Sequence, residues 1–289
     1  MPVSIRPRRS VLFMPGSNPR AMEKARELAA DGIIFDLEDA VAPDMKEAAR
    51  SGVAAAAAAG GYGRRELVLR VNALDTPWGH ADLTEAARLP IDAVLLPKVE
   101  NADRVRLTLD LLDRSGAPPK LSVWCMIETP RGVLAAAEIA AASPRLGALV
   151  LGTSDLTKDL HATEMRDRLP LMTALGLVLL AARAHGRAIL DGVHLDLGDA
   201  GGFVAACRQG RELGFDGKTL IHPQQIAAAN DAFSPLPTEI DRARRIIAAY
   251  AEASAAGKGA ARIEGRLVEA LHIEEAHRTL ALAEAIAAG

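Results

Sequence analysis

Cysteine and aromatic residues are scarce in this chain of 289 residues. Its two cysteines, Cys125 and Cys207, are too few for a disulfide framework. Both lie in apolar runs, so we expect buried free thiols in a reducing compartment rather than catalytic or metal-binding groups. Aromatic residues make up 3% of the chain and hydrophobic residues 49%, so the predicted core consists mainly of Ala, Leu, Val and Ile.

An excess of basic charge is also missing. The 34 basic and 37 acidic side chains leave a net charge of −3, which gives no support for a nucleic-acid-binding surface. The chain has no apolar run of about 18 residues, so no membrane span is predicted. Its N-terminal stretch lacks the apolar segment of a signal peptide. These absences favour a cytoplasmic globular protein whose partner is a small molecule.

Short apolar runs alternate with stretches of helical periodicity along residues 1–236, which we assign to one domain. The strand candidates are residues 10–14, 32–37, 67–71, 93–96, 121–127, 148–151, 188–190 and 217–221. The helix candidates are residues 18–30, 43–59, 102–115, 131–142, 170–185, 200–213 and 223–232. Nearly continuous apolar runs are typical of parallel strands that are buried on both faces.

Eight such strands with helical crossovers predict an α/β fold of the (β/α)8 TIM-barrel type. An open doubly wound sheet is the alternative. Such a sheet normally has a glycine-rich phosphate turn, G-x-G-x-x-G, after its first strand, and this chain has none.

Residues 237–289 follow the eighth predicted strand and form a C-terminal helical extension. We predict a helix over residues 238–255, a break at Gly257-Lys258-Gly259 and a second helix from about Gly265 to the end. The extension is either a lid or arm that reaches a neighbouring subunit, or a pair of helices that closes the side of the barrel. The pattern alone leaves both possibilities open.

Charged residues follow nearly every predicted strand, and barrel active sites lie at these carboxyl ends. The acidic residues are Asp36, Glu38, Asp39, Glu100, Glu128, Asp155 and Asp191. The other polar residues at these positions include Arg70, Asn72, Lys98, Lys218 and His222. Clustered carboxylates repel one another unless they are protonated or neutralised. Mg2+ prefers one or two carboxylates with water and substrate oxygens. Because Glu128 and Asp155 follow adjacent strands, we predict that they bind Mg2+ or Mn2+.

Arg70 ends the third strand beside these acids. We expect its guanidinium to hold a substrate carboxylate or enolate. The alternative is a structural ion pair with Asp36 or Glu38. For Glu38 and Asp39 the alternative to a site role is capping of the helix that begins near Pro43.

Basic residues also surround the start of the first predicted helix. Arg20 and Lys24 lie there. They follow the predicted N-cap residue Asn18 and the first helical residue Pro19 in the sequence. A helix N-terminus with basic side chains can bind phosphate. Basic residues on surface helices are common, so this signal is weak by itself.

Seven segments, in order along the chain, resemble a known family. They are RSVLFMPGSNPRAMEKA, IIFDLEDAV, LRVNALDTPWGHADL, LPKVE, IETPRGV, GTSDLTKDL and FDGKTLIHPQQI. Together they are similar to the citrate lyase β-subunit-like family, which includes the malyl-CoA lyases, within the Mg2+-dependent aldolase superfamily. The resemblance implies a (β/α)8 barrel that acts on acyl-CoA thioesters as a homotrimer or homohexamer.

The resemblance also implies roles for single residues. The counterparts of Glu128 and Asp155 bind Mg2+, the counterpart of Arg70 contacts the substrate, and those of Glu38 and Asp39 hold metal-bound waters. In the first loop, Phe13, Arg20 and Lys24 handle CoA. The residue pattern by itself indicates the metal pair and the arginine but not CoA.

The C-terminal segment ARIEGRLVEALHIEEAHRTL matches the lid of this family, which reaches over the active site of a neighbouring subunit. The lyases commonly carry an aspartate there as general acid and base, and Glu269 occupies that position in this chain. The tail is most similar to the branch that hydrolyses malyl-CoA. We therefore expect either Claisen-type C–C cleavage or condensation, or thioester hydrolysis to malate and CoA. The alternative for Glu269 is an exposed helix charge.

Two further functions stay open at this point. A citryl-thioester lyase subunit would act on an acyl-carrier protein. A pyruvate-type class II aldolase would lack the extension and use an early histidine base, but His80 and His161 do not directly follow a strand. A non-enzymatic scaffold is disfavoured, because the predicted metal and anion residues are all present.

Overall fold

The computed structural model describes residues 6–255, 260–263 and 266–288, which form two units. The first unit is Arg8–Phe233, and the second comprises residues from Ser234 onward with those before Arg8. The division between these two units lies after Phe233. The reason is that Phe233 packs in the core of the first unit, whereas Leu236 is half-exposed.

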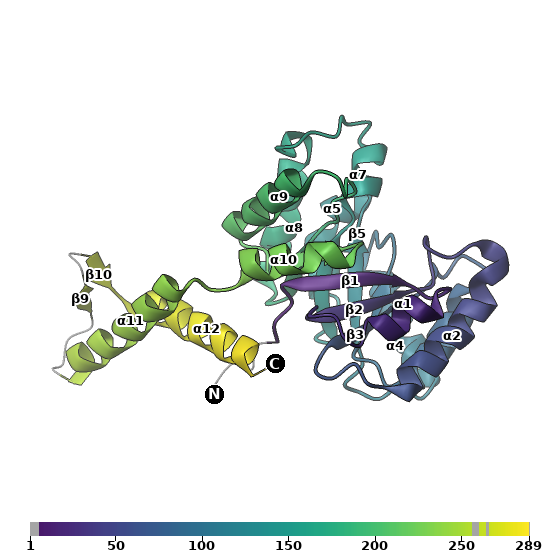
Figure 1. Ribbon diagram of the computed structural model, residues 1–289, viewed down its shortest axis with the longest axis horizontal. Helices are drawn as coiled ribbons and strands as arrows, with labels where there is room; N and C mark the ends of the chain where they lie inside the picture. Colours follow the sequence, from purple (N-terminus) through teal and green to yellow (C-terminus); the bar gives the residue numbers. More distant parts are fainter. Residues whose placement is uncertain (1–5, 256–259, 264–265, 289) are drawn as a thin grey trace. The chain divides into compact units, whose positions relative to one another are not determined.

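Eight parallel strands close the first unit into a barrel (Figure 1). They are β1 (Ser10–Pro15), β2 (Gly32–Asp36), β3 (Glu66–Arg70), β4 (Ala93–Leu96), β5 (Ser122–Ile127), β6 (Leu146–Leu151), β7 (Ala188–Asp191) and β8 (Gly217–Leu220). Each strand pairs with the next in the sequence, and β8 pairs with β1. The predicted TIM barrel is confirmed, and the open doubly wound sheet is excluded.

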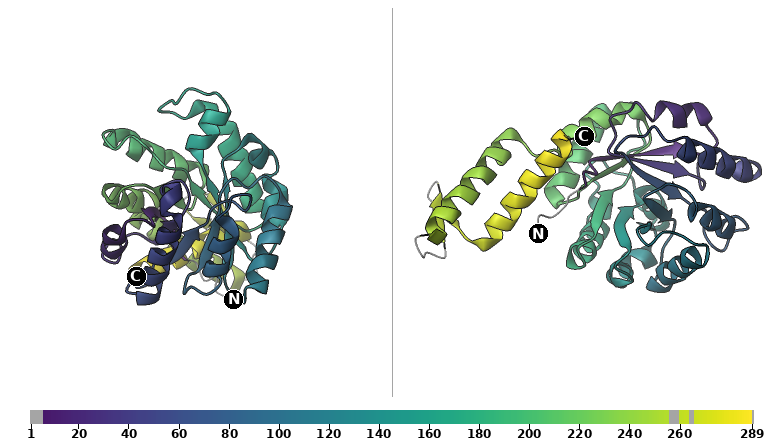
Figure 2. Two further views of the ribbon diagram at one scale, coloured as in Figure 1. Left: turned by 90° about the vertical axis from the view of Figure 1, so that its right-hand side faces the viewer. Right: turned by 90° about the horizontal axis from the view of Figure 1, so that it is seen from below.

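Helices surround the barrel, as the left view of Figure 2 shows. They are α1 (Pro19–Lys24), α2 (Lys46–Ala59), α3 (Gly79–Ala86), α4 (Ala102–Arg114), α5 (Pro130–Leu134), α6 (Ala136–Ala141), α7 (Thr153–Asp159), α8 (Met172–Ala184), α9 (Ala200–Leu213) and α10 (Ile226–Phe233). Short 3-10 turns precede three of them, η1 (Pro43–Met45), η2 (Leu169–Leu171) and η3 (Pro223–Gln225). The helix predicted over residues 18–30 is wrong in its extent, because α1 ends at Lys24.

The sequence prediction missed α3 and α7 and merged α5 with α6. Both missed helices begin without a hydrogen bond from an N-cap side chain. By contrast, α1, α4, α5 and α9 begin at Asn18, Asn101, Thr129 and Asp199, whose side chains accept a backbone N–H. A side-chain cap marks a helix start in a sequence, but α2 and α8 also lack one and were predicted. The missed helices are in addition short, with 8 residues in α3 and 7 in α7, so their periodicity is weak as well.

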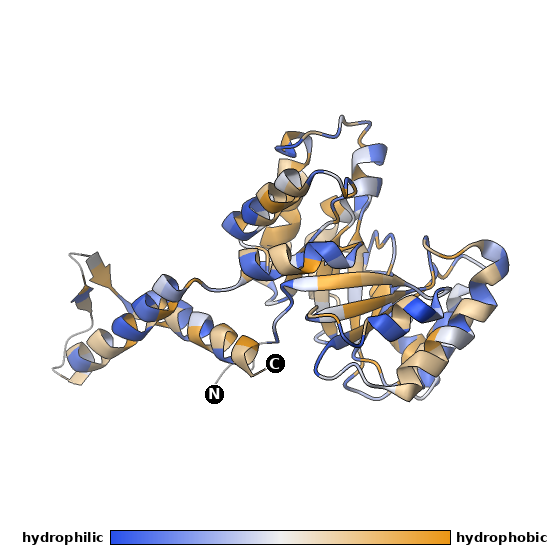
Figure 3. Ribbon diagram, in the orientation of Figure 1, coloured by the Kyte–Doolittle hydropathy of each residue, from blue (hydrophilic) through white to orange (hydrophobic). Residues whose placement is uncertain are grey.

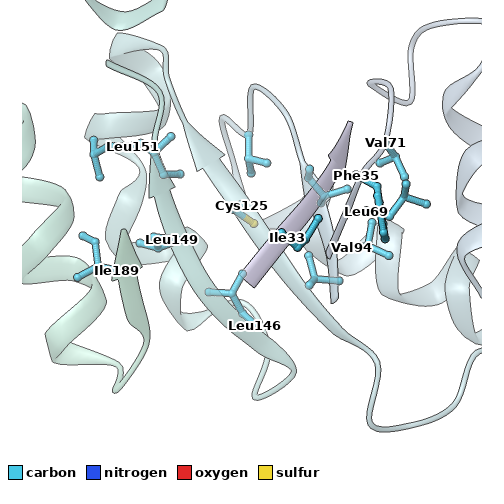
Figure 4. Close-up of a cluster of buried hydrophobic side chains, with 14 of the residues drawn as sticks. Ile33, Phe35, Leu69, Val71, Val94, Cys125, Leu146, Leu149, Leu151 and Ile189 are labelled. Carbon is cyan, nitrogen blue, oxygen red and sulfur yellow. The ribbon is translucent and has the colours of Figure 1, made fainter. Parts of the chain in front are cut away.

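The visible strands of the barrel have mainly the hydrophobic colour in Figure 3. Ile34, Val68 and Trp124 belong to a cluster inside the barrel. Ile33 and Leu69 belong to a second cluster that extends to the helices (Figure 4). Successive residues thus alternate between two apolar layers, which explains the nearly continuous apolar runs in the sequence.

Both cysteines are free and buried, as predicted. Cys125 lies within the buried cluster drawn in Figure 4. Burial raises the pKa of the Cys125 thiol far above its ordinary value, and it raises the pKa of Cys207 to about 11. Neither thiol is therefore a nucleophile near neutral pH.

The second unit contains two long helices and a small hairpin. Its elements are α11 (Pro237–Ala255), β9 (Ala261–Ile263), β10 (Arg266–Val268) and α12 (Ala270–Ala287). The prediction of a helix from Gly265 is wrong, because β10 pairs with β9 and α12 begins only at Ala270. Val268 is buried opposite Ala261, and this packing favours the hairpin. The predicted break at Gly257-Lys258-Gly259 lies outside the described residues.

The apolar faces of α11 and α12 pack against each other and against the hairpin, through Ala243, Ile246 and Ala276. Among the helices that the structure describes, none is both long and apolar enough to cross a lipid bilayer.

Candidate active site

Arg70 lies at the centre of a charge cluster at the carboxyl ends of the strands. Asp36 and Arg70 are register partners at the ends of β2 and β3. The Arg70 Nε and Nη2 groups donate to the two Asp36 carboxylate oxygens over 2.7 and 2.6 Å. Nη1 lies 2.9 Å from Glu38 Oε2 and 3.5 Å from Asp39 Oδ2. The structural ion pair that was the alternative for Arg70 is therefore present, and the guanidinium is held in one orientation.

The Arg70 guanidinium is buried and stays positively charged. Burial alone would lower the pKa of Arg70, but Asp36 and Glu38 outweigh it and raise the pKa above its ordinary value. Phe13 covers one side of the guanidinium, with 4.8 Å between Cζ and the ring centroid. Phe13, for which the resemblance implied a place in the first loop and a role with CoA, therefore lies in β1 beside Arg70. Its contact with CoA stays a prediction.

The loop after β2 brings Glu38 and Asp39 to Arg70. Asp36 shapes this loop, because its carboxylate accepts the backbone N–H groups of Glu38 and Ala40 over 2.8 and 3.2 Å. The alternative that Glu38 or Asp39 caps the next helix is wrong. The turn η1 begins after Ala42 without a hydrogen bond from a side-chain cap.

Lys98 follows β4 and connects this loop to the predicted metal ligands. Its Nζ lies 3.0 Å from Glu38 Oε1, 3.9 Å from Asp155 Oδ2 and 4.0 Å from Asp39 Oδ1. Its backbone N–H donates to Glu128 Oε1 over 2.8 Å. Burial alone would lower the pKa of Lys98, but Glu38 raises it well above its ordinary value, so the ammonium keeps its charge.

Glu128 and Asp155 follow the adjacent paired strands β5 and β6, as expected. Glu128 is buried, whereas about a third (34%) of the Asp155 side chain is exposed. Only glycine fits at position 152, because a Cβ on residue 152 would collide with the Glu128 side chain. Burial and the nearby Glu38 raise the pKa of Glu128 to about 7. A cation beside Glu128 would keep its carboxylate ionised.

Lys46 supports the acidic loop from α2, and the sequence analysis missed it. Its ammonium donates to the backbone carbonyls of Leu37 and Glu38, each over 2.7 Å, and lies 5.3 Å from the Trp78 ring centroid. Burial lowers the pKa of Lys46, although Asp36 and Glu38 oppose this shift. A lysine at the start of a helix carries no sequence signal for such a role.

With all of its side chains ionised, the cluster carries more negative than positive charge. Its acidic groups are Asp36, Glu38, Asp39, Glu128 and Asp155, and its basic groups are Lys46, Arg70 and Lys98. With all of them ionised, two negative charges are in excess, which is the charge of one divalent cation. Glu38 Oε2 is buried and accepts no hydrogen bond of good geometry, despite its short distance to Arg70 Nη1.

The chemistry of the donors also fits Mg2+. Within the described part of the chain, no three His, Cys, Asp or Glu side chains are grouped as a metal site. Glu128 and Asp155 are carboxylates that follow adjacent strands, and they would leave the other coordination positions to water or substrate. This division is the one Mg2+ commonly takes in proteins.

The predicted CoA-binding residues Arg20 and Lys24 lie on α1, directly after β1. The predicted cap is confirmed, because the Asn18 side chain accepts the Ala21 N–H over 3.1 Å. Arg20 and Lys24 are exposed. Their contact with CoA stays a prediction.

Asp191 and Lys218 do not join the cluster, although they also lie at or near strand ends. Asp191 is fully buried, accepts from Lys218 Nζ over 2.9 Å and accepts from Arg168 Nη1 with both oxygens over 2.7 Å. A Cβ at Gly210 would lie 3.0 Å from Asp191 Oδ2, so this carboxylate points outward to α9. His222 is exposed and caps η3. The charged residues at the ends of β7 and β8 are therefore separate from the cluster around Arg70.

Glu269 lies in the second unit, at the N-cap position of α12. It is exposed, and its backbone N–H donates to His272 Nδ1 over 3.1 Å. Its part in catalysis stays a prediction.

A family model for the HpcH/HpaI aldolase/citrate lyase proteins matches residues 9–223, which cover nearly the whole barrel. The chain belongs to the HpcH/HpaI aldolase/citrate lyase family. This finding confirms the family to which the sequence motifs pointed.

Three relatives are informative. A (3S)-malyl-CoA thioesterase of Cereibacter sphaeroides is 53% identical over 282 residues, covering 98% of this chain and 96% of the relative. An L-malyl-CoA/β-methylmalyl-CoA lyase of the same species is 38% identical and covers 98% and 96%. The crystal structure of CitE from Mycobacterium tuberculosis in complex with magnesium, acetoacetate and coenzyme A is 34% identical. It has a TM-score of 0.77 and covers 95% of this chain and 97% of CitE.

Proposed function

We propose that this protein is a Mg2+-dependent enzyme that hydrolyses (3S)-malyl-CoA, or a closely similar 3-hydroxyacyl-CoA, to the free acid and CoA. One observation favours thioester hydrolysis over C–C cleavage. The similarity to the thioesterase, at 53% identity, is much higher than the 38% to the lyase. Because it covers 98% of the chain, it includes most of the second unit, where the two activities are expected to differ.

Glu128 and Asp155 are the residues that would hold Mg2+. When bound there, Mg2+ supplies charge neutralisation and polarises the oxygen atoms of the substrate. CitE, which is 34% identical, was crystallised with magnesium and coenzyme A, and this supports the choice of ion and of substrate class. Mn2+ prefers similar oxygen ligands and can substitute.

Arg70 supplies a fixed positive charge to the acyl group. Asp36 and Glu38 orient its guanidinium before substrate binds, so little reorganisation is needed when negative charge develops on the thioester oxygen. Glu38 and Asp39 accept hydrogen bonds from waters around the ion. Phe13, Arg20 and Lys24 bind CoA.

Glu269 is the base in this proposal. A water oxygen bonds to the thioester carbonyl carbon, and Glu269 takes the proton that this water releases. The C–S bond then breaks, and the CoA sulfur takes the proton back from Glu269. Glutamate reaches about 1.5 Å farther than the aspartate of the lyases, and displacements of this size change positioned chemistry strongly. We further propose that α12 brings Glu269 to the site of another subunit in a homotrimer or homohexamer.

The test is a product analysis with (3S)-malyl-CoA and Mg2+. We expect free CoA and malate in equal amounts, and no activity after chelation with EDTA until Mg2+ or Mn2+ is restored. Glyoxylate with acetyl-CoA would instead show C–C cleavage and contradict the proposal. Citryl-CoA and β-methylmalyl-CoA, assayed in parallel, define the acyl group.

Variants of Glu269 test its role within the same assay. Glu269→Ala should cut turnover sharply and leave Mg2+ binding unchanged, and Glu269→Asp should shift the products toward cleavage. Glu275→Ala, which removes another exposed carboxylate of α12, is the matched control and should keep full turnover. Unchanged turnover of Glu269→Ala would show that Glu269 is an exposed helix charge without a catalytic role.

A further inference from the structure

Lys98 has a backbone conformation that is unusual for a residue with a side chain. Its φ angle is 47°, in the left-handed region that favours glycine. Such strain persists where the surrounding structure holds it, and it is frequent at functional sites. Here, two consecutive N–H groups bind the end of β5. Lys98 donates to Glu128 Oε1 over 2.8 Å, and Val99 donates to the Met126 carbonyl over 3.1 Å.

The Lys98 side chain lies between two groups of carboxylates that would otherwise repel each other. Its Nζ is 3.0 Å from Glu38 of the loop after β2 and 3.9 Å from Asp155, which follows β6. Glu128, which follows β5, is bound by the backbone of the same residue. One residue therefore contacts the acidic loop and both predicted metal ligands, from the ends of three different strands.

We propose that Lys98 is a positioning residue that fixes the acidic loop of Glu38 relative to the metal-binding pair Glu128 and Asp155. The backbone N–H orients Glu128, and the ammonium allows Glu38 to approach the pair closely. This inference rests on the proposed Mg2+-dependent function of the same site. Lys98 has no part in proton transfer in this proposal, because it contacts the carboxylates and not the substrate.

This arrangement predicts the direction in which metal affinity and turnover change when the Lys98 side chain is removed. At a pH at which Glu128 is ionised with or without Lys98, the ammonium repels a divalent cation bound by Asp155 and Glu128, so its removal should tighten metal binding. Its removal should also release Glu38 from its place beside Arg70, so turnover should fall. A residue that only stabilises the fold would change both quantities in the same direction, together with the melting temperature.

Lys98→Gly is the decisive variant, because glycine keeps the N–H and adopts φ of 47° without strain. We expect Mn2+, measured by calorimetric titration of the metal-free protein, to bind about three- to tenfold more tightly. We expect kcat for (3S)-malyl-CoA to fall at least about tenfold, since small displacements of positioned groups have effects of this size. The melting temperature should stay near that of the wild type.

Three further variants separate the contributions. Lys98→Arg keeps the charge and should keep the wild-type Mn2+ affinity. Lys98→Ala matches Lys98→Gly except for backbone strain, so it should melt at a lower temperature. Lys120→Met removes an exposed lysine before β5 and should leave Mn2+ affinity and kcat unchanged.

Weaker Mn2+ binding by Lys98→Gly, or an unchanged kcat, would overturn the inference. Absence of Mn2+ binding to the wild type would overturn it as well. Because the Mn2+ titration needs no substrate, failure of malyl-CoA hydrolysis in the wild type is a separate outcome. In that case, tighter Mn2+ binding by Lys98→Gly would still support the positioning role and would contradict only the proposed substrate.

Discussion

The barrel has two charge clusters near the carboxyl ends of its strands, and they differ in the sign of their excess charge and in their exposure. The cluster around Arg70, from β2 to β6, has more carboxylates than cations, and its Lys98 and Asp39 side chains are 43% and 58% exposed. The cluster around Asp191, at β7 and β8, has one carboxylate between Arg168 and Lys218, with exposures of 0%, 12% and 1%.

This difference shows that a charged residue at a strand end is not sufficient to mark a site. The Asp191 carboxylate points outward to α9, where both its oxygens are used by Arg168 and Lys218. The carboxylates around Arg70 are in excess and in part open to solvent. A partly exposed cluster with an excess of carboxylates can bind a cation or substrate, whereas a buried carboxylate shared by two cations stabilises the fold.

The largest effect is expected for Asp191→Ala, which leaves two buried cations without their shared partner. Breaking a buried ion pair in this way costs about 3–5 kcal/mol of the free energy of unfolding. Chemical denaturation would measure this loss. Activity per folded molecule should be unchanged at a temperature where the variant is folded, and a large drop in kcat would show that the two clusters are not independent.

The same cluster predicts a dependence of stability on pH. Burial alone would raise the pKa of Asp191, but Lys218 and Arg168 outweigh it and hold the pKa below its usual range. The ionised carboxylate therefore stabilises the folded state above the unfolded-state pKa of about 3.9, and this contribution is lost as the pH falls through the lower folded-state value. Asp191→Asn should show a flatter stability profile in this acidic range.

The next largest effect is expected for Arg70→Ala. A guanidinium directed at developing charge in a buried site is worth about 3 kcal/mol, so kcat/KM should fall by about two orders of magnitude or more. Arg70→Lys should restore little of this kcat/KM, because a lysine cannot form the two parallel hydrogen bonds with the Asp36 carboxylate. Steady-state kinetics on folded protein is the measurement, and a nearly native rate for Arg70→Ala would leave Arg70 with a structural role only.

A smaller effect is expected for Lys46→Met. The Glu38 carbonyl loses its partner, whereas the Leu37 carbonyl keeps the Asn72 side chain, which donates over 2.9 Å. We expect a loss of about 1–3 kcal/mol in the free energy of unfolding and a moderate fall in kcat. Glu47→Gln is the control on the same helix, because it changes the charge of an exposed side chain next to Lys46 in the sequence. If both variants lost activity equally, Lys46 would have no specific link to the acidic loop.

The sequence predicted those parts of the molecule that depend on local pattern and chain order. Apolar runs predicted the strands, and their order predicted that Glu128 and Asp155 would follow adjacent strands. The ion pair of Arg70 with Asp36 was included only as the alternative to a substrate-binding role. In a parallel barrel, residues at consecutive strand ends meet regardless of the details of packing.

The remaining features depend on contacts that no local pattern encodes. The contact of Lys46 with two backbone carbonyls depends on how α2 packs beneath the loop. The outward direction of Asp191 depends on its place in the pleat and on the presence of Arg168, which is distant in sequence. The hairpin of β9 and β10 forms because Val268 packs against Ala261 in the second unit. Tertiary packing decides all three.

The central claim is that the cluster around Arg70 binds a divalent cation through Glu128 and Asp155. Titration of the metal-free protein with Mn2+, followed by electron paramagnetic resonance, tests it most directly. We predict one bound ion per chain for the wild type and for Asp191→Asn, and at least about a hundredfold weaker binding for Glu128→Gln and for Asp155→Asn, since each loses a charged ligand. Unchanged Mn2+ affinity in Glu128→Gln would contradict the account.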